Sequence, residues 1–159
     1  MLNFDDKGFL IPDNSIRTSL DDFEQIFVKN IPTQERKTHY QSYINYSKKL
    51  KALCGNVELL QWIDGSFVTK KEKPNDIDLV TFLDFENTKD IHSELESFKE
   101  PLSKTVYQVD AYIVYTYSQN HKKYFFQQSD TAYWMDRFTK TKVNRKGQRF
   151  KKGFIEIIF

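Results

Sequence analysis

The chain has 159 residues, of which 39% are hydrophobic and 29% charged, and its 14 Phe and 9 Tyr supply ample apolar surface. These numbers exclude an intrinsically disordered chain and fit one domain of ordinary size. The net charge of +2 hides an asymmetry, because residues 137–153 hold eight basic side chains and no acidic one, whereas residues 1–136 hold 16 basic and 21 acidic ones. Such a basic block indicates a polyanion or an acidic partner, and a solvated basic loop explains it equally well.

The sequence contains no signal for export or membrane insertion. Asp5 and Asp6 stand where a signal peptide needs basic residues followed by an apolar run. No uncharged apolar stretch approaches the roughly 20 residues that a membrane-spanning helix needs. The single cysteine, Cys54, excludes an internal disulfide and a multi-cysteine zinc site. We therefore expect a cytoplasmic protein without membrane contact.

The first third of the chain predicts an extended lead-in and two helices. Residues 1–17 have the composition of an extended segment. Ser19 resembles a helix N-cap, and the apolar residues after it recur at helical spacing up to Pro32. Thr33 is expected to cap a second, longer helix that ends near Leu53.

Beyond this helix pair, strands alternate with helices. Four segments are typical of strands because they are short apolar runs or are rich in β-branched and aromatic residues: 57–63, 77–83, 105–117 and 153–159. Two intervening segments are typical of helices: 88–98 and 129–138, the second capped by Ser129. The order predicts a single α+β (α/β-like) domain over 1–159, with a lead-in and helix pair (1–55) before a sheet-containing core (56–159).

One stretch carries the residues expected for chemistry. After the strand at 57–63, Gly65-Ser66 is followed by nine residues and then Asp76-Ile77-Asp78-Leu79. Because side chains alternate along a strand, Asp76 and Asp78 are expected on one face while their apolar neighbours enter the core. Two adjacent carboxylates repel each other, and a hard cation such as Mg²⁺ resolves that conflict. Gly65 allows close approach of the backbone, and Ser66 can hold phosphate oxygens.

A third carboxylate fits the same scheme. Asp110 interrupts the most apolar predicted strand, and such local contradictions tend to mark function. If that strand pairs with 77–83, Asp110 lies beside Asp76 and Asp78 and completes a three-carboxylate metal site. A calcium-binding loop is excluded, because the positions after Asp78 lack further acidic residues or Gly in register.

These residues resemble the signature of the DNA polymerase β-type nucleotidyltransferase superfamily. The resemblance extends to a small uncharacterised bacterial branch with a single domain of this kind, through features that span nearly the whole chain: LDDFEQIFV (20–28), Arg36, the DGSF turn (64–67), YW (133–134) and KGFIEI (152–157). It implies a minimal nucleotidyltransferase fold, a twisted mixed sheet flanked by helices. It also implies two Mg²⁺ ions, with Mn²⁺ as a substitute, held by Asp76, Asp78 and Asp110, and an NTP whose triphosphate contacts Gly65 and Ser66.

The resemblance makes an NMP-transferring enzyme the leading hypothesis and leaves its acceptor open. An RNA 3′ end fits the basic segment, and a Tyr, Ser or Thr of a partner protein fits the small size of the chain. A toxin–antitoxin or phage-defence setting follows only by analogy with the branch. Two other classes remain: a non-catalytic nucleotide- or partner-binding regulatory module with the same fold, and a plain nucleic-acid-binding domain.

Several neighbouring residues have simpler explanations. Asp64 is expected in a turn rather than as a ligand, and Lys70, Lys71 and Lys73 in a solvated loop. Tyr133 and Trp134 could stack on a base, but their helical spacing with Phe138 favours core packing.

Overall fold

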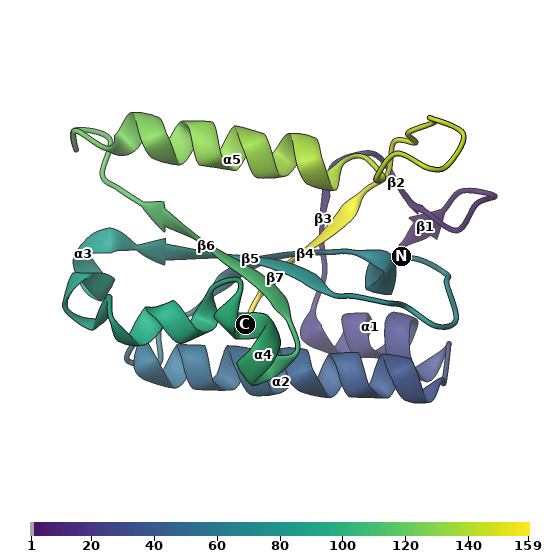
Figure 1. The fold of residues 1–159 in the computed structure, drawn as a ribbon, viewed down its shortest axis with the longest axis horizontal. Coiled ribbons are helices and arrows are strands. Elements are labelled where there is room, and N and C mark those ends of the chain that lie inside the picture. The colour runs from purple at the N-terminus through teal and green to yellow at the C-terminus, as the bar shows by residue number, and fades with distance from the viewer. Residues whose placement is uncertain (1) are drawn as a thin grey trace.

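The apolar segments of the second half form a five-stranded mixed sheet in a computed structural model, which describes residues 2–159. In spatial order its strands are β3 (Ser15–Arg17), β7 (Phe154–Ile158), β4 (Leu60–Asp64), β5 (Asp78–Asp84) and β6 (Asp110–Thr116). The outer pairs β3/β7 and β5/β6 are parallel, whereas β4 runs antiparallel to both of its neighbours. Helices cover both faces of this sheet (Figure 1), so the predicted α+β class is confirmed.

The two predicted N-terminal helices are present, and their predicted caps are confirmed. Ser19 Oγ accepts a hydrogen bond from the Asp22 amide at the start of α1 (Leu20–Glu24), which continues as the π-helical η1 (Gln25–Lys29). Thr33 Oγ1 accepts from the Arg36 amide at the start of α2 (Gln34–Leu53). In Figure 1 these helices lie together with α4 (Leu102–Tyr107) below the sheet, while α5 (Tyr124–Phe138) lies above it.

Three predicted elements differ from the structure. The segment 88–98 is not one helix but three short pieces, α3 (Phe85–Thr88), η3 (Lys89–Ile91) and η4 (Glu94–Phe98). The strand predicted over 105–117 is wrong in its first part, because α4 extends to Tyr107 and the left-handed Gln108, with φ 60°, ends it. Helix α5 begins at Tyr124, before the predicted cap Ser129.

The two faces of the sheet bury different residues. Alternation along each strand sends Ile63 of β4 and Leu79 of β5 toward α2, into a large apolar cluster that also holds Tyr43 and Leu50. The opposite side chains, among them Trp62 and Val80, join a smaller cluster beneath α5. Asp64 and Asp78 therefore belong to the α5 face by alternation.

The lead-in adds a small second sheet beside the main one. Strand β1 (Asn3–Phe4) pairs antiparallel with β2 (Leu10–Ile11). The turn between them docks onto the loop after β4, where the Lys70 amide donates to Gly8 O at 3.0 Å. Within residues 2–159, no helix is both long and apolar enough to cross a membrane.

Candidate functional site

Three carboxylates form a row at one end of the neighbouring strands β4, β5 and β6. The antiparallel pairing of β4 and β5 places Asp64 directly opposite Asp78, and the parallel pairing of β5 and β6 places Asp110 on the other side of Asp78. Asp64 is the last residue of β4 and not part of a turn, so the prediction for it is wrong. Asp76 precedes β5 by two residues. Ile77 and Leu79 are buried in the core, as predicted.

Gly65 allows the carboxylates to approach the backbone closely. Its φ of 85° and ψ of −172° belong to a region that only glycine adopts readily. A Cβ there would lie 2.9 Å from Asp78 Oδ2 and 3.1 Å from Asp76 Oδ1. The two carboxylates therefore meet above Gly65, and any larger residue would displace them.

Ser66 orients Asp76. The Ser66 amide and hydroxyl both donate to Asp76 Oδ1, at 2.9 and 2.8 Å, while Ser66 Oγ accepts from the Asn75 amide at 2.8 Å. The Ser66 hydroxyl, which was predicted to hold phosphate oxygens, thus donates to the Asp76 carboxylate in this structure. Of the predicted site residues, the structure brings together Gly65, Ser66, Asp76 and Asp78.

Buried Arg36 fixes the loop that follows Ser66. Its guanidinium is 0% exposed and donates to four carbonyl oxygens, those of Phe27, Phe67, Thr69 and Lys71, at 2.6 to 3.1 Å. Burial among neutral partners lowers the pKa of Arg36 to about 10. Three of these carbonyls belong to residues 67–71, so Arg36 holds the loop that carries Ser66 against α2.

The carboxylates at Gly65 differ in their electrostatics. Burial, together with the charges of Asp76 and Asp64, raises the pKa of Asp78 to about 7, against an opposing contribution from Lys142. Burial also acts to raise the pKa of Asp76, but the two hydrogen bonds from Ser66 and the charge of Lys142 outweigh it and leave that pKa below its usual value. Lys142 Nζ lies 3.7 Å from Asp76 Oδ2. Asp78 is therefore the carboxylate whose charge is least compensated.

Asp110 lies beside Asp78 in register but faces a different counterion. Lys104 Nζ, on α4, lies 2.8 Å from Asp110 Oδ1 and 3.0 Å from its Oδ2. Partial burial and the charge of Asp110 raise the pKa of nearby Glu100. Asp110 does not line the cavity described below, so the structure places it next to Asp78 without joining it to the Asp76–Asp78 pair.

A buried ion pair lies at the base of the site, and the sequence analysis did not predict it. Lys152 Nζ binds Asp64 Oδ1 and donates to Phe138 O at 3.1 Å. Both side chains are buried, and burial raises the pKa of Asp64 to about 6 although Lys152 opposes the shift. The available signal was an acidic residue ending one apolar strand and a lysine just before another, at Asp64 and Lys152.

A cavity of about 1120 Å³ opens above the carboxylates. Three carboxylates line it, those of Asp64, Asp76 and Asp78. The basic block also contributes five lining residues: Arg137, Lys140, Lys142, Arg149 and Lys152. Lys70 and Lys71 are exposed, as predicted for a solvated loop, and they also line this cavity.

Two neighbouring aromatic residues have separate roles. Trp134 is 9% exposed and packs against Tyr112, with ring centroids 4.4 Å apart, which confirms the predicted core packing. Tyr133 is 54% exposed and lines the cavity, so the core prediction is wrong for this residue. Successive helix residues point about 100° apart, and this separates the two rings.

A family model spans almost the whole chain, over residues 2–158. The chain belongs to DUF6932, a family of unknown function. No curated protein and no solved structure matches the chain. Membership of DUF6932 supplies no activity, so function has to be argued from the site.

The site contains oxygen donors suited to a divalent cation, but its side chains are not arranged as a complete coordination shell. Within residues 2–159, no group of three or more His, Cys, Asp or Glu side chains is arranged to hold a metal ion. Asp76 and Asp110 are instead neutralised in part by Lys142 and Lys104. Carboxylate oxygens are nevertheless the donors that Mg²⁺ prefers, and a cation would offset both the burial and the repulsion that raise the pKa of Asp78. The donor set therefore fits Mg²⁺ in its chemistry.

Proposed function

We propose that this protein is a Mg²⁺-dependent nucleotidyltransferase that transfers an NMP from an NTP to a hydroxyl acceptor. One observation carries the proposal: carboxylates and cations line the same cavity. The carboxylates suit a divalent ion, and the cations suit a polyphosphate. The resemblance to the DNA polymerase β-type superfamily, through Gly65-Ser66 and the spaced carboxylates, supports the same reaction class.

Asp76 and Asp78 would hold the metal ions, and Asp110, on the neighbouring strand, would have to turn from Lys104 to join them. When bound, Mg²⁺ would supply charge neutralisation for the phosphates and lower the pKa of the acceptor hydroxyl. Ser66 keeps the Asp76 carboxylate oriented through its two hydrogen bonds. The cations of the basic block, Arg137, Lys140, Lys142 and Arg149, line the space where a triphosphate would lie.

The reaction is an in-line displacement at phosphorus. The acceptor oxygen forms a bond to the α-phosphorus, the bond from the α-phosphorus to the oxygen bridging to the β-phosphate breaks, and pyrophosphate leaves with that electron pair. The acceptor proton passes to solvent. Positioning and electrostatic stabilisation provide most of the catalysis in such reactions, and the polar cavity walls are suited to both.

Pyrophosphate release and transfer of label from [α-³²P]NTP to total RNA or protein test the proposal. We expect Mg²⁺-dependent labelling by the wild type and a fall of at least about 100-fold in Asp78→Asn. Asp90→Asn is a matched control, because Asp90 is an exposed carboxylate on η3. Equal labelling by the wild type and Asp78→Asn, or no labelling with any of the four NTPs, would contradict the proposal.

One observation favours a second function, a non-catalytic regulatory module. The lysine counterions at Asp76 and Asp110 are the arrangement expected of a site that needs no metal. Calorimetry separates the two functions. Binding of NTP only with Mg²⁺, followed by pyrophosphate release, identifies the enzyme, whereas metal-independent binding without turnover identifies the module.

A further inference from the structure

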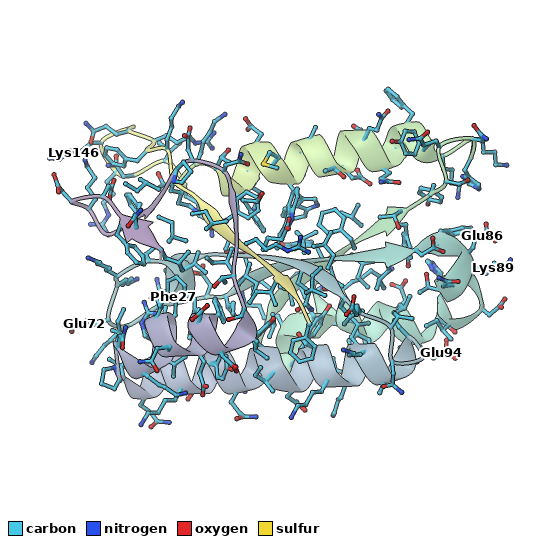
Figure 2. All side chains as sticks on the ribbon, turned by 180° about the vertical axis from the view of Figure 1, so that it is seen from behind. Phe27, Glu72, Glu86, Lys89, Glu94 and Lys146 are labelled. Carbon is cyan, nitrogen blue, oxygen red and sulfur yellow. The ribbon has the colours of Figure 1, made fainter. Side chains whose placement is uncertain are left out.

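The basic block forms a projecting arm, which we define as residues 140–151, between α5 and β7. Its stem is a short antiparallel pair in which Lys140 bridges Lys151 and the Thr141 amide donates to Phe150 O at 2.8 Å. Asn144 orders the tip, because its Oδ1 accepts from the amides of Lys146 and Gln148, both at 2.9 Å. The arm extends beyond the sheet beside β1 and β2 in Figure 1, and Figure 2 shows Lys146 at its outer end.

The charges of the arm are compensated at the stem and uncompensated at the tip. Lys140 pairs with Asp136, and Lys151 Nζ lies 3.1 Å from Asp13 Oδ2. In the part of the chain that the structure describes, the exposed residues Arg145, Lys146 and Arg149 have no carboxylate within ion-pair distance. Three free cations on a structured projection form a surface for a polyanion.

The arm connects this surface to the candidate site. Lys142 extends from the stem to Asp76, and Arg149 and Phe150 line the cavity. Phe150 stacks on Phe9 of the lead-in, with ring centroids 6.2 Å apart. A polyanion bound along the arm would therefore be led into the cavity and toward the carboxylates.

We infer that the arm binds single-stranded nucleic acid and delivers its 3′ hydroxyl to the cavity, so that the acceptor in the proposed function is a nucleic-acid end. Single-strand binding sites combine a basic track with exposed aromatic rings, and Tyr133 supplies such a ring in the cavity. The cavity exceeds the volume of a typical small-molecule pocket, so it has room for a terminal nucleotide in addition to an NTP. A narrow strand can follow the arm to the recessed carboxylates, whereas the projecting arm would hold a folded acceptor protein away from them.

Binding of oligonucleotides without NTP or Mg²⁺ tests the arm separately from catalysis. The probes are 5′-fluorescein-labelled RNA and DNA of about 12 nucleotides, identical in sequence and with free 3′ ends. Fluorescence anisotropy between about 50 and 200 mM KCl should give a slope of log K against log[KCl] near −2, as expected for about three phosphate contacts. Tighter binding of RNA would identify RNA ends as the acceptor, and equal binding would identify single strands of either kind.

Arm variants show whether these contacts are responsible. Arg145→Gln/Lys146→Gln/Arg149→Gln should bind at least ~10-fold more weakly and lose most of the salt dependence. Lys37→Gln/Lys48→Gln/Lys122→Gln removes the same charge from exposed positions on α2 and just before α5, and should bind like the wild type. Lys146→Glu is a second arm variant that changes one exposed side chain, and circular dichroism checks that each variant is folded.

The outcomes separate this inference from the proposed function on which it rests. Arm-dependent binding that persists in Asp78→Asn supports the inference even if no NTP is ever turned over. Equal binding by the arm and control variants, or no oligonucleotide binding, overturns it. Transfer of label to a protein acceptor with no oligonucleotide binding also overturns it, while leaving nucleotidyl transfer intact.

Discussion

The two faces of the sheet satisfy their polar groups in different ways. Toward α2, buried Gln61 accepts from Tyr43 Oη at 2.9 Å and donates to Thr81 Oγ1 at 3.2 Å, so polar groups are paired inside an apolar cluster. Toward α5, the carboxylates gather at one end of the strands, where burial and the neighbouring charges raise the pKa of Asp78 to about 7. The first face contributes stability, whereas the second holds repulsive charges near a cavity. Unrelieved electrostatic strain of this kind is typical of a ligand site.

The largest effect is expected at Arg36, which links α2 to the loop behind the carboxylates. Arg36→Met leaves four carbonyls, most of them buried, without the guanidinium donor, so the free energy of unfolding should fall by about 3–5 kcal/mol. Urea denaturation measures this change. Lys37→Met is the control, because Lys37 is exposed on the same helix and should change stability by less than about 0.5 kcal/mol. A similar small change for Arg36→Met would show that the loop needs no such anchor.

The buried pair beneath the cavity should be nearly as sensitive. Lys152→Met leaves Asp64 buried without a counterion, and we expect a loss of about 3 kcal/mol at pH 8. The loss should be smaller at pH 5, where Asp64, with its pKa of about 6, is protonated in the folded protein. Lys151→Met, at an exposed neighbour, is the control. Equal losses at both pH values would show that ionisation of Asp64 does not cause the loss of stability in Lys152→Met.

Removing the strained charge should stabilise the metal-free protein. Because the folded pKa of Asp78 is raised above its unfolded value, its contribution to stability declines as pH rises from about 4 through about 7. At pH 8 without metal, Asp78→Asn should therefore be more stable by about 2 kcal/mol, or roughly 4–8 °C in Tm. At pH 4 the difference should disappear.

Divalent cations should affect the wild type and Asp78→Asn differently. Mg²⁺ should raise the Tm of the wild type at pH 8 and leave Asp78→Asn unchanged, since binding to the folded state alone stabilises it. Asp90→Asn should follow the wild type in both respects. A destabilised Asp78→Asn would show that the carboxylate row is held together by attraction and not strained by repulsion.

The sequence predicted what depends on local spacing and missed what depends on long-range pairing. Gly65-Ser66 and the Asp76/Asp78 pair are readable because their geometry follows from one turn and one strand. The position of Asp110 beside Asp78 was expected, but for a partly wrong reason, because a helix ends just before it. The counterion Lys142 lies far along the chain from Asp76, and no periodic pattern encodes such contacts.

The smallest effect is expected on the face toward α2, where the polar network has spare partners. Tyr43→Phe removes the hydroxyl that donates to Gln61 Oε1, but Ser47 Oγ also donates to that oxygen, at 3.3 Å. No acceptor is left without a partner, so the loss should be only about 0.5–1 kcal/mol, and transfer of label should not change. Ser47→Ala removes the second donor, and its combination with Tyr43→Phe leaves Gln61 Oε1 buried and unpaired. The double variant should therefore lose more than the sum of the single variants, as a double-mutant cycle would measure. Strict additivity would show that the network is not cooperative, and a loss of labelling in Tyr43→Phe would show that the two faces are coupled.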